Sequence, residues 1–170
     1  MSMTRILTER QLREGEYRSL TRGINTAFLL EIKEDHVEFR VLFKRALEMI
    51  RSGAEIKARE FAELLGFLRD EIETYFSLEE FYGGFDMAFQ ADPSHARTVA
   101  KLKHQHEQLF TCLNGLVERA EQIAYHEVPH SRLRGLLADF VLFANDLRKH
   151  EDWELDLISQ QFALDVGVGD

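Results

Sequence analysis

The sequence is poor in residues that interrupt helices or cross-link chains. Its 170 residues include two prolines, ten glycines and a single cysteine, Cys112. One cysteine excludes an internal disulfide framework and a cysteine-rich zinc site. The long stretches without proline or glycine are rich in Leu, Glu, Arg, Ala and Lys, which are good helix formers. The composition therefore predicts an all-α fold, with Cys112 on the flank of a helix.

Long apolar runs and an excess of positive charge are also missing. Nowhere do about 18 apolar residues follow one another, as a membrane-spanning helix would require. The segment from Met1 to Leu30 has no apolar run of signal-peptide length. The formal net charge of −9 works against phosphate binding as the main function. We therefore expect a soluble cytoplasmic protein whose partners include neither nucleic acid nor a membrane.

Apolar residues recur at helical spacing in four stretches of the chain. These run from about Thr26 to Arg51, Glu55 to Tyr82, Pro93 to Tyr125 and His130 to Phe162. Four long amphipathic helices with mostly short connections bury their apolar faces best as an antiparallel four-helix bundle. We expect this bundle over residues 26–162, an N-terminal arm or short helix over residues 1–25, a loop from Gly83 to Pro93 and a C-terminal tail over residues 163–170.

Each predicted helix carries polar residues on its apolar face, where burial is costly unless the group is paired or binds a metal. Six residues share this position: His36, Tyr75, Glu79, His106, His150 and Glu154. At 1.5 Å per residue, His106 and His150 lie level on either side of the Pro129 turn. His36 and Tyr75 are level only if residues 52–58 form an extended connection, which we expect.

The spacing within two helices favours metal binding. Tyr75 with Glu79, and His150 with Glu154, are pairs four residues apart, which places two ligands on one helix face. Taken alone, a histidine or tyrosine in such a position is usually a hydrogen-bonded core residue. A glutamate is almost never fully buried without a partner. Together the six residues predict a metal site, and mixed imidazole and carboxylate donors suit iron, although zinc or manganese would accept them.

The four segments that carry these residues resemble the hemerythrin-like, or HHE cation-binding, family. The segments read EDHVEFR, YFSLEEFYGG, KHQHEQLF and LRKHEDWELDL, and they follow one another in the family's order. The resemblance implies two iron ions, with Glu79 and Glu154 as bridges and the histidines as terminal ligands. The family places a histidine where this chain has Tyr75, so Tyr75 either ligates in its place or leaves one ion with an open position.

The resemblance implies an iron protein that binds or reacts with a small diatomic molecule or peroxide, namely O2, NO or H2O2. A phenolate from Tyr75 would stabilise ferric iron and favour a catalase-like reaction with peroxide, which makes Tyr75 the candidate catalytic residue. One alternative is a module that senses oxygen or iron and signals to a partner protein. Another is a metal-free bundle in which Tyr75 marks a decayed site.

Overall fold

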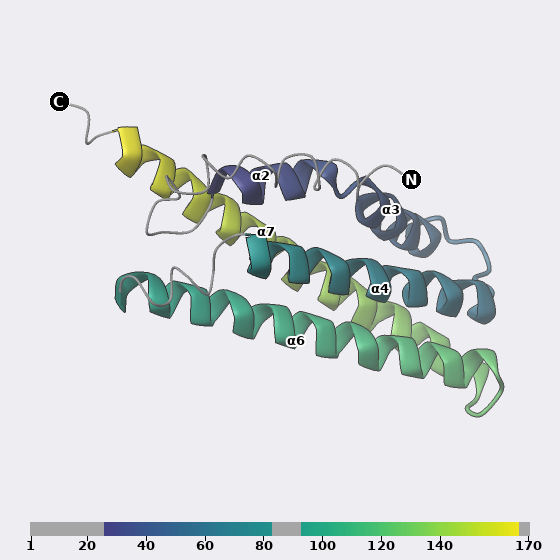
Figure 1. Ribbon diagram of the computed structural model, residues 1–170. Coiled ribbons are helices and arrows are strands. Elements are labelled where there is room, and N and C mark those ends of the chain that lie inside the picture. Colours follow the sequence, from purple (N-terminus) through teal and green to yellow (C-terminus); the bar gives the residue numbers. More distant parts are fainter. Residues whose placement is uncertain (1–25, 83–92, 167–170) are drawn as a thin grey trace, which may run out of the picture.

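The computed structural model describes residues 26–82 and 93–166, with only the backbone described at some helix ends. All regular structure in these ranges is helical (Figure 1), which confirms the predicted all-α class. A short 3-10 turn, η2 (His130–Arg132), precedes the last helix. The α-helices are α2 (Thr26–Asp35), α3 (Val37–Arg51), α4 (Ala58–Tyr82), α6 (Pro93–Ala124) and α7 (Leu133–Val166).

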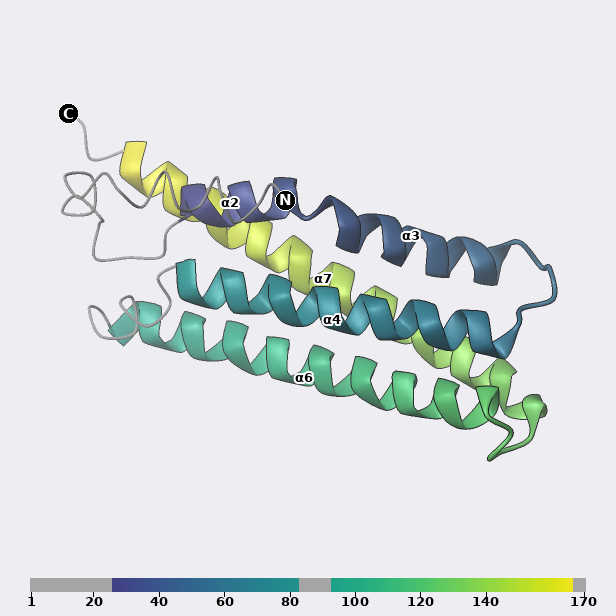
Figure 2. The same ribbon diagram turned by 45° about the vertical axis from the view of Figure 1, so that its right-hand side comes forward.

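The helices form the predicted antiparallel four-helix bundle, with α2 and α3 together acting as its first member. Figure 2 shows α4 running back alongside α3, α6 lying beside α4, and α7 crossing behind them. Residues 52–57 between α3 and α4 are not helical, as the expected extended connection requires. Gly53 has a φ of +65°, the left-handed conformation that commonly follows the last turn of a helix.

The prediction of one continuous helix from Thr26 to Arg51 is wrong, because the structure has two helices there. The stretch from Thr26 to Arg51 is interrupted at His36, whose backbone φ of −78° and ψ of 55° depart from helical values. The Arg40 guanidinium donates hydrogen bonds to the carbonyls of Lys33 and Glu34, which the break deprives of helical partners. The break therefore gives α2 and α3 different directions without leaving these two carbonyls unsatisfied.

The predicted boundaries at Thr26, Arg51, Tyr82 and Pro93 are confirmed, and the remaining ones differ by a few residues. The helix α7 continues to Val166, beyond its predicted end at Phe162, so residues 163–166 of the expected C-terminal tail are helical. The predicted N-terminal arm and the loop from Gly83 lie outside the described residues, and so do residues 167–170. Within the described ranges, no helix combines the length and the apolar character needed to cross a membrane.

Two apolar clusters lie along the bundle, with a polar layer between them. The main core includes Phe61, Phe140 and Leu147, and each fully buried side chain of this kind stabilises the fold by about 1.5–3 kcal/mol. A smaller cluster joins Leu29 of α2 to Leu102 of α6. The six polar residues expected on the apolar faces are all buried: His36, Tyr75, Glu79, His106, His150 and Glu154.

Candidate metal centre

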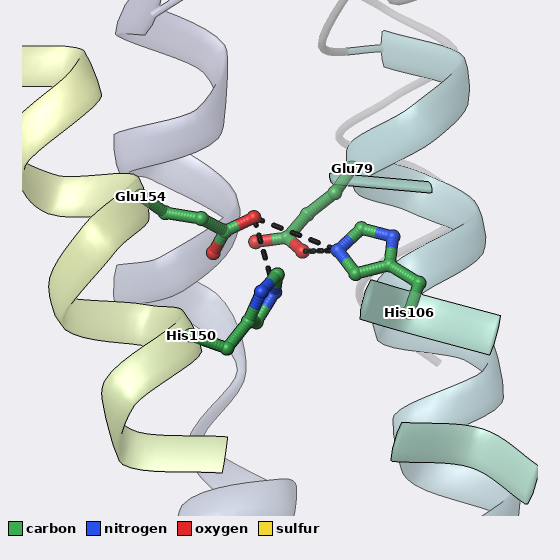
Figure 3. Close-up of side chains that lie close together, drawn as sticks. All are labelled: Glu79, His106, His150 and Glu154. Atoms are coloured by element: carbon green, nitrogen blue, oxygen red, sulfur yellow. Dashed lines mark ion pairs between the residues drawn. The ribbon is translucent and has the colours of Figure 1, made fainter. Parts of the chain in front are cut away.

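Four buried side chains converge between α4, α6 and α7 (Figure 3). Glu79 extends from α4, His106 from α6, and His150 and Glu154 from successive turns of α7. One ligand atom from each lies within 4.8 Å of the other three. None of the four residues is more than 3% exposed, so the group is closed to bulk water.

The distances between donor atoms match those around one transition-metal ion. The Nε2 atom of His106 lies 3.4 Å from Oε2 of Glu79 and 3.5 Å from Oε1 of Glu154. The Nε2 atom of His150 lies 3.3 Å from the same Glu154 oxygen. A metal about 2.1 Å from each donor in a tetrahedral arrangement would hold neighbouring donors about 3.4 Å apart. The residues present therefore fit a metal ion.

Hydrogen bonds at the outer edge of each imidazole orient it for this role. The Nδ1 atom of His106 lies 2.9 Å from Oε1 of Glu80, and Nδ1 of His150 lies 2.9 Å from Oε1 of Gln105. A carboxylate or amide oxygen accepts, so Nδ1 carries a proton and Nε2 faces the centre, where it can offer its lone pair to a metal once it has lost any proton of its own. Neither Glu80 nor Gln105 is among the six residues that the sequence predicted for the site.

Among the described residues, several inward-facing atoms of the centre have no hydrogen-bond partner. These are Nε2 of His150, Oε1 of Glu154 and Oε2 of Glu79. Burying such groups without a partner is costly. A cation at the point where they converge would satisfy all three, in agreement with the distances between the donor atoms.

The charges in the centre shift the pKa values of its members. Burial lowers the pKa of His106, but its contacts with carboxylates, first Glu154 and then Glu79, outweigh burial and raise it to about 10. Burial would raise the pKa of Glu154, yet the close contacts of its carboxylate with the His106 and His150 imidazoles hold that pKa well below its ordinary value. A proton on His106 thus balances carboxylate charge when no ion does.

Tyr75 lies on the other side of the two glutamates. Its hydroxyl oxygen accepts a hydrogen bond from Nζ of Lys33 at 2.8 Å. Burial and the nearby charges of Glu79 and Glu154 raise the pKa of Tyr75 far above its ordinary value, which favours the neutral phenol. The predicted role of Tyr75 as a phenolate ligand remains a prediction, since its oxygen here has another partner.

His36 is buried at the break between α2 and α3 but is not one of the four converging residues. Its ring packs against Tyr75 with 4.8 Å between centroids, as their predicted common level requires. Its Nδ1 atom lies 4.0 Å from Oε2 of Glu71. The proposed ligand role of His36 therefore also stays a prediction.

Lys33 is a third residue of this centre, after Glu80 and Gln105, that the sequence did not predict. Its Nζ atom lies 3.1 Å from Oε1 of Glu79 and also contacts Oε2 of Glu154. The side chain is 13% exposed. Burial lowers its pKa, but Glu79 and Glu154 outweigh burial and raise it. Lys33 follows Leu29 by four residues, so a charged residue on the same helix face was the available signal.

Comparison with protein families identifies the chain. The model of the hemerythrin HHE cation binding domain matches residues 28–158. Comparisons with curated proteins and with solved structures returned no match. The matched range contains all of α3, α4 and α6 and the four converging residues. The chain therefore belongs to the hemerythrin HHE cation-binding domain family.

Proposed function

We propose that this protein binds iron through Glu79, His106, His150 and Glu154. We further propose that a small oxidant reacts at that iron, and that this oxidant is H2O2. The observation that carries the proposal is the convergence of four buried donors at distances that fit one ion. Two imidazoles and two carboxylates suit iron, and iron can accept a further ligand beyond these four donors.

The burial of the centre limits the size of its substrate. Its four side chains are at most 3% exposed, so only a very small molecule can reach the ion without rearrangement of the helices. A surface hollow between α6 and α7 includes Gln105 and His150 in its lining, which brings solvent to the outer edge of that imidazole. These features favour O2, NO or H2O2 over a larger organic substrate.

The charge of the donor set favours peroxide over reversible O2 carriage. Two carboxylates stabilise ferric over ferrous iron, because the more highly charged ion gains more from anionic donors. Reversible O2 binding starts from ferrous iron. Bound iron would supply Lewis-acid and electron-transfer chemistry toward peroxide. Two molecules of H2O2 give two of water and one of O2, so this reaction needs no external reductant.

The function is tested with purified protein loaded with ferrous iron under anaerobic conditions. We expect bound iron after desalting, and O2 release from added H2O2 measured with an oxygen electrode. The H106Q/H150Q variant should lose both, and the H104Q variant, which alters an exposed histidine, should lose neither. Iron-loaded protein that releases O2 no faster than H106Q/H150Q would contradict the proposed reaction, and absence of bound iron would contradict the metal site itself.

A further inference from the structure

The two buried glutamates each divide their oxygens between two kinds of cationic partner. On one side, Oε2 of Glu79 and Oε1 of Glu154 face the imidazole nitrogens. On the other side, Oε1 of Glu79 and Oε2 of Glu154 both contact the Lys33 ammonium. A carboxylate that bridges two ions gives one oxygen to each. Here the oxygens that a second ion would need are those that Lys33 contacts.

The surroundings of Lys33 match the bonding capacity of an ammonium group. An ammonium has three N–H donors and no acceptor. Its nitrogen has three oxygen neighbours: the Tyr75 hydroxyl at 2.8 Å, Oε1 of Glu79 at 3.1 Å, and Oε2 of Glu154. Lys33 therefore donates hydrogen bonds to the Tyr75 hydroxyl and to Oε2 of Glu154, and it forms an ion pair with Oε1 of Glu79.

The helix that carries Lys33 is fixed against the bundle. Leu29, one turn earlier in α2, is 1% exposed and packs with Val99 and Leu102 of α6. After Lys33, the break at His36 and the hydrogen bond from Arg40 to the Lys33 carbonyl define where α2 ends. Lysine is almost never buried without a partner, and a long flexible lysine usually extends toward water. Lys33 instead points inward.

We infer that the Lys33 ammonium takes the place of the second cation, so that the centre binds one metal ion per chain and not the two expected from the family resemblance. The inference rests on the metal binding proposed above. Lys33 provides a fixed positive charge beside one oxygen of each carboxylate. The single metal ion binds on the other side, to the carboxylate oxygens that face the imidazoles and to the imidazoles themselves. In this arrangement Tyr75 bonds to Lys33 in place of metal.

Metal stoichiometry tests the inference. Full-length wild-type protein, reconstituted with excess ferrous iron under anaerobic conditions and desalted, should hold one iron per chain by elemental analysis. After oxidation it should give the EPR signal of an isolated high-spin ferric ion. The K33A and K33Q variants, which remove the charge, should hold two irons per chain. Their oxidised pairs should be EPR-silent because bridged ferric ions couple. The K33R variant keeps the charge and should hold one.

The control is K44A, which removes a lysine whose side chain is 78% exposed and should leave the stoichiometry at one. Two irons per wild-type chain would overturn the inference while leaving the proposed function intact. One iron in every folded neutral variant at position 33 would overturn it as well, since Lys33 would then not exclude the second ion. Absence of bound iron in the wild-type protein would contradict both the proposed function and this inference. That result differs from a count of two irons per chain, which would contradict the inference alone. If K33A does not fold, the number of irons per chain in K33Q and in the wild-type protein still tests the inference.

Discussion

The two halves of the polar centre are built in different ways. On α6 and α7, both imidazoles have an outer hydrogen-bond partner, Glu80 or Gln105, and their inner nitrogens lie at metal-ligand spacing from carboxylates. On the side of α2, Lys33 fills the space between the same carboxylates, and both ring nitrogens of His36 lack a hydrogen-bond partner among the described residues. One half is preorganised for a metal ion, whereas the other supplies its own cation.

The largest expected effect is the loss of a ligand from the imidazole half. H150A should lower iron affinity by more than the roughly 10–100-fold that removal of an outer partner causes, because a direct donor disappears. Iron per chain after desalting should fall close to zero. Elemental analysis measures it, with H104A as the exposed control. Unchanged iron content in folded H150A would show that the α6 and α7 half does not bind the ion.

Removal of an outer partner should have the next largest effect. E80A and Q105A should each weaken iron binding about 10–100-fold, because the imidazoles lose the bonds that fix their orientation. Competition with a chelator of known affinity measures this loss. E80Q retains an acceptor oxygen and should recover part of it, and E73A, at an exposed position of the same helix, should bind iron as wild type does.

A smaller effect is expected in the pH dependence of stability after chelation of the metal. The pKa of His106 is raised from 6.5 to about 10 in the folded protein. Its contribution to stability is therefore fully present below pH 6.5 and is lost as the pH rises toward 10. Urea denaturation of chelated protein should show a falling free energy of unfolding across this window. Iron-loaded protein should not show that fall, because the ion takes the place of the proton. A flat profile for the chelated protein would contradict the assignment.

The smallest effect is expected from the Lys33 half. H36A and Y75F should each change iron affinity by less than about 10-fold, which is the smallest effect expected from removing an outer hydrogen-bond partner of an imidazole. The reason is that the ion is held by donors on the opposite side of the carboxylates. The optical spectrum of oxidised Y75F should equal that of wild type, without loss of a phenolate charge-transfer band. A lost band, or an H36A defect as large as that of E80A, would show that the two halves act as one dinuclear centre.

The fold could be predicted from the sequence because periodicity reports which face of each helix is buried. Leu102, Leu109 and Leu113 repeat at helical spacing in α6, and all three are buried. The same pattern placed His106 among them, and its companions on the other helices are buried too. The interruption at His36 was not predictable in this way, since the apolar pattern continues through it to Phe39. Arg40 supports the break through a contact that periodicity does not encode.

The sequence by itself determined the bundle, the burial of six polar residues and the level of each along its helix, since all three depend on local spacing. The tertiary structure decided which of these residues meet. It brought Glu79, His106, His150 and Glu154 together, gave the imidazoles their outer partners and turned Lys33 inward. Position along one helix fixes the direction of a side chain but not its partner across the core. A long lysine can reach water or a buried carboxylate from the same backbone position, and only the packing of α2 selects between them.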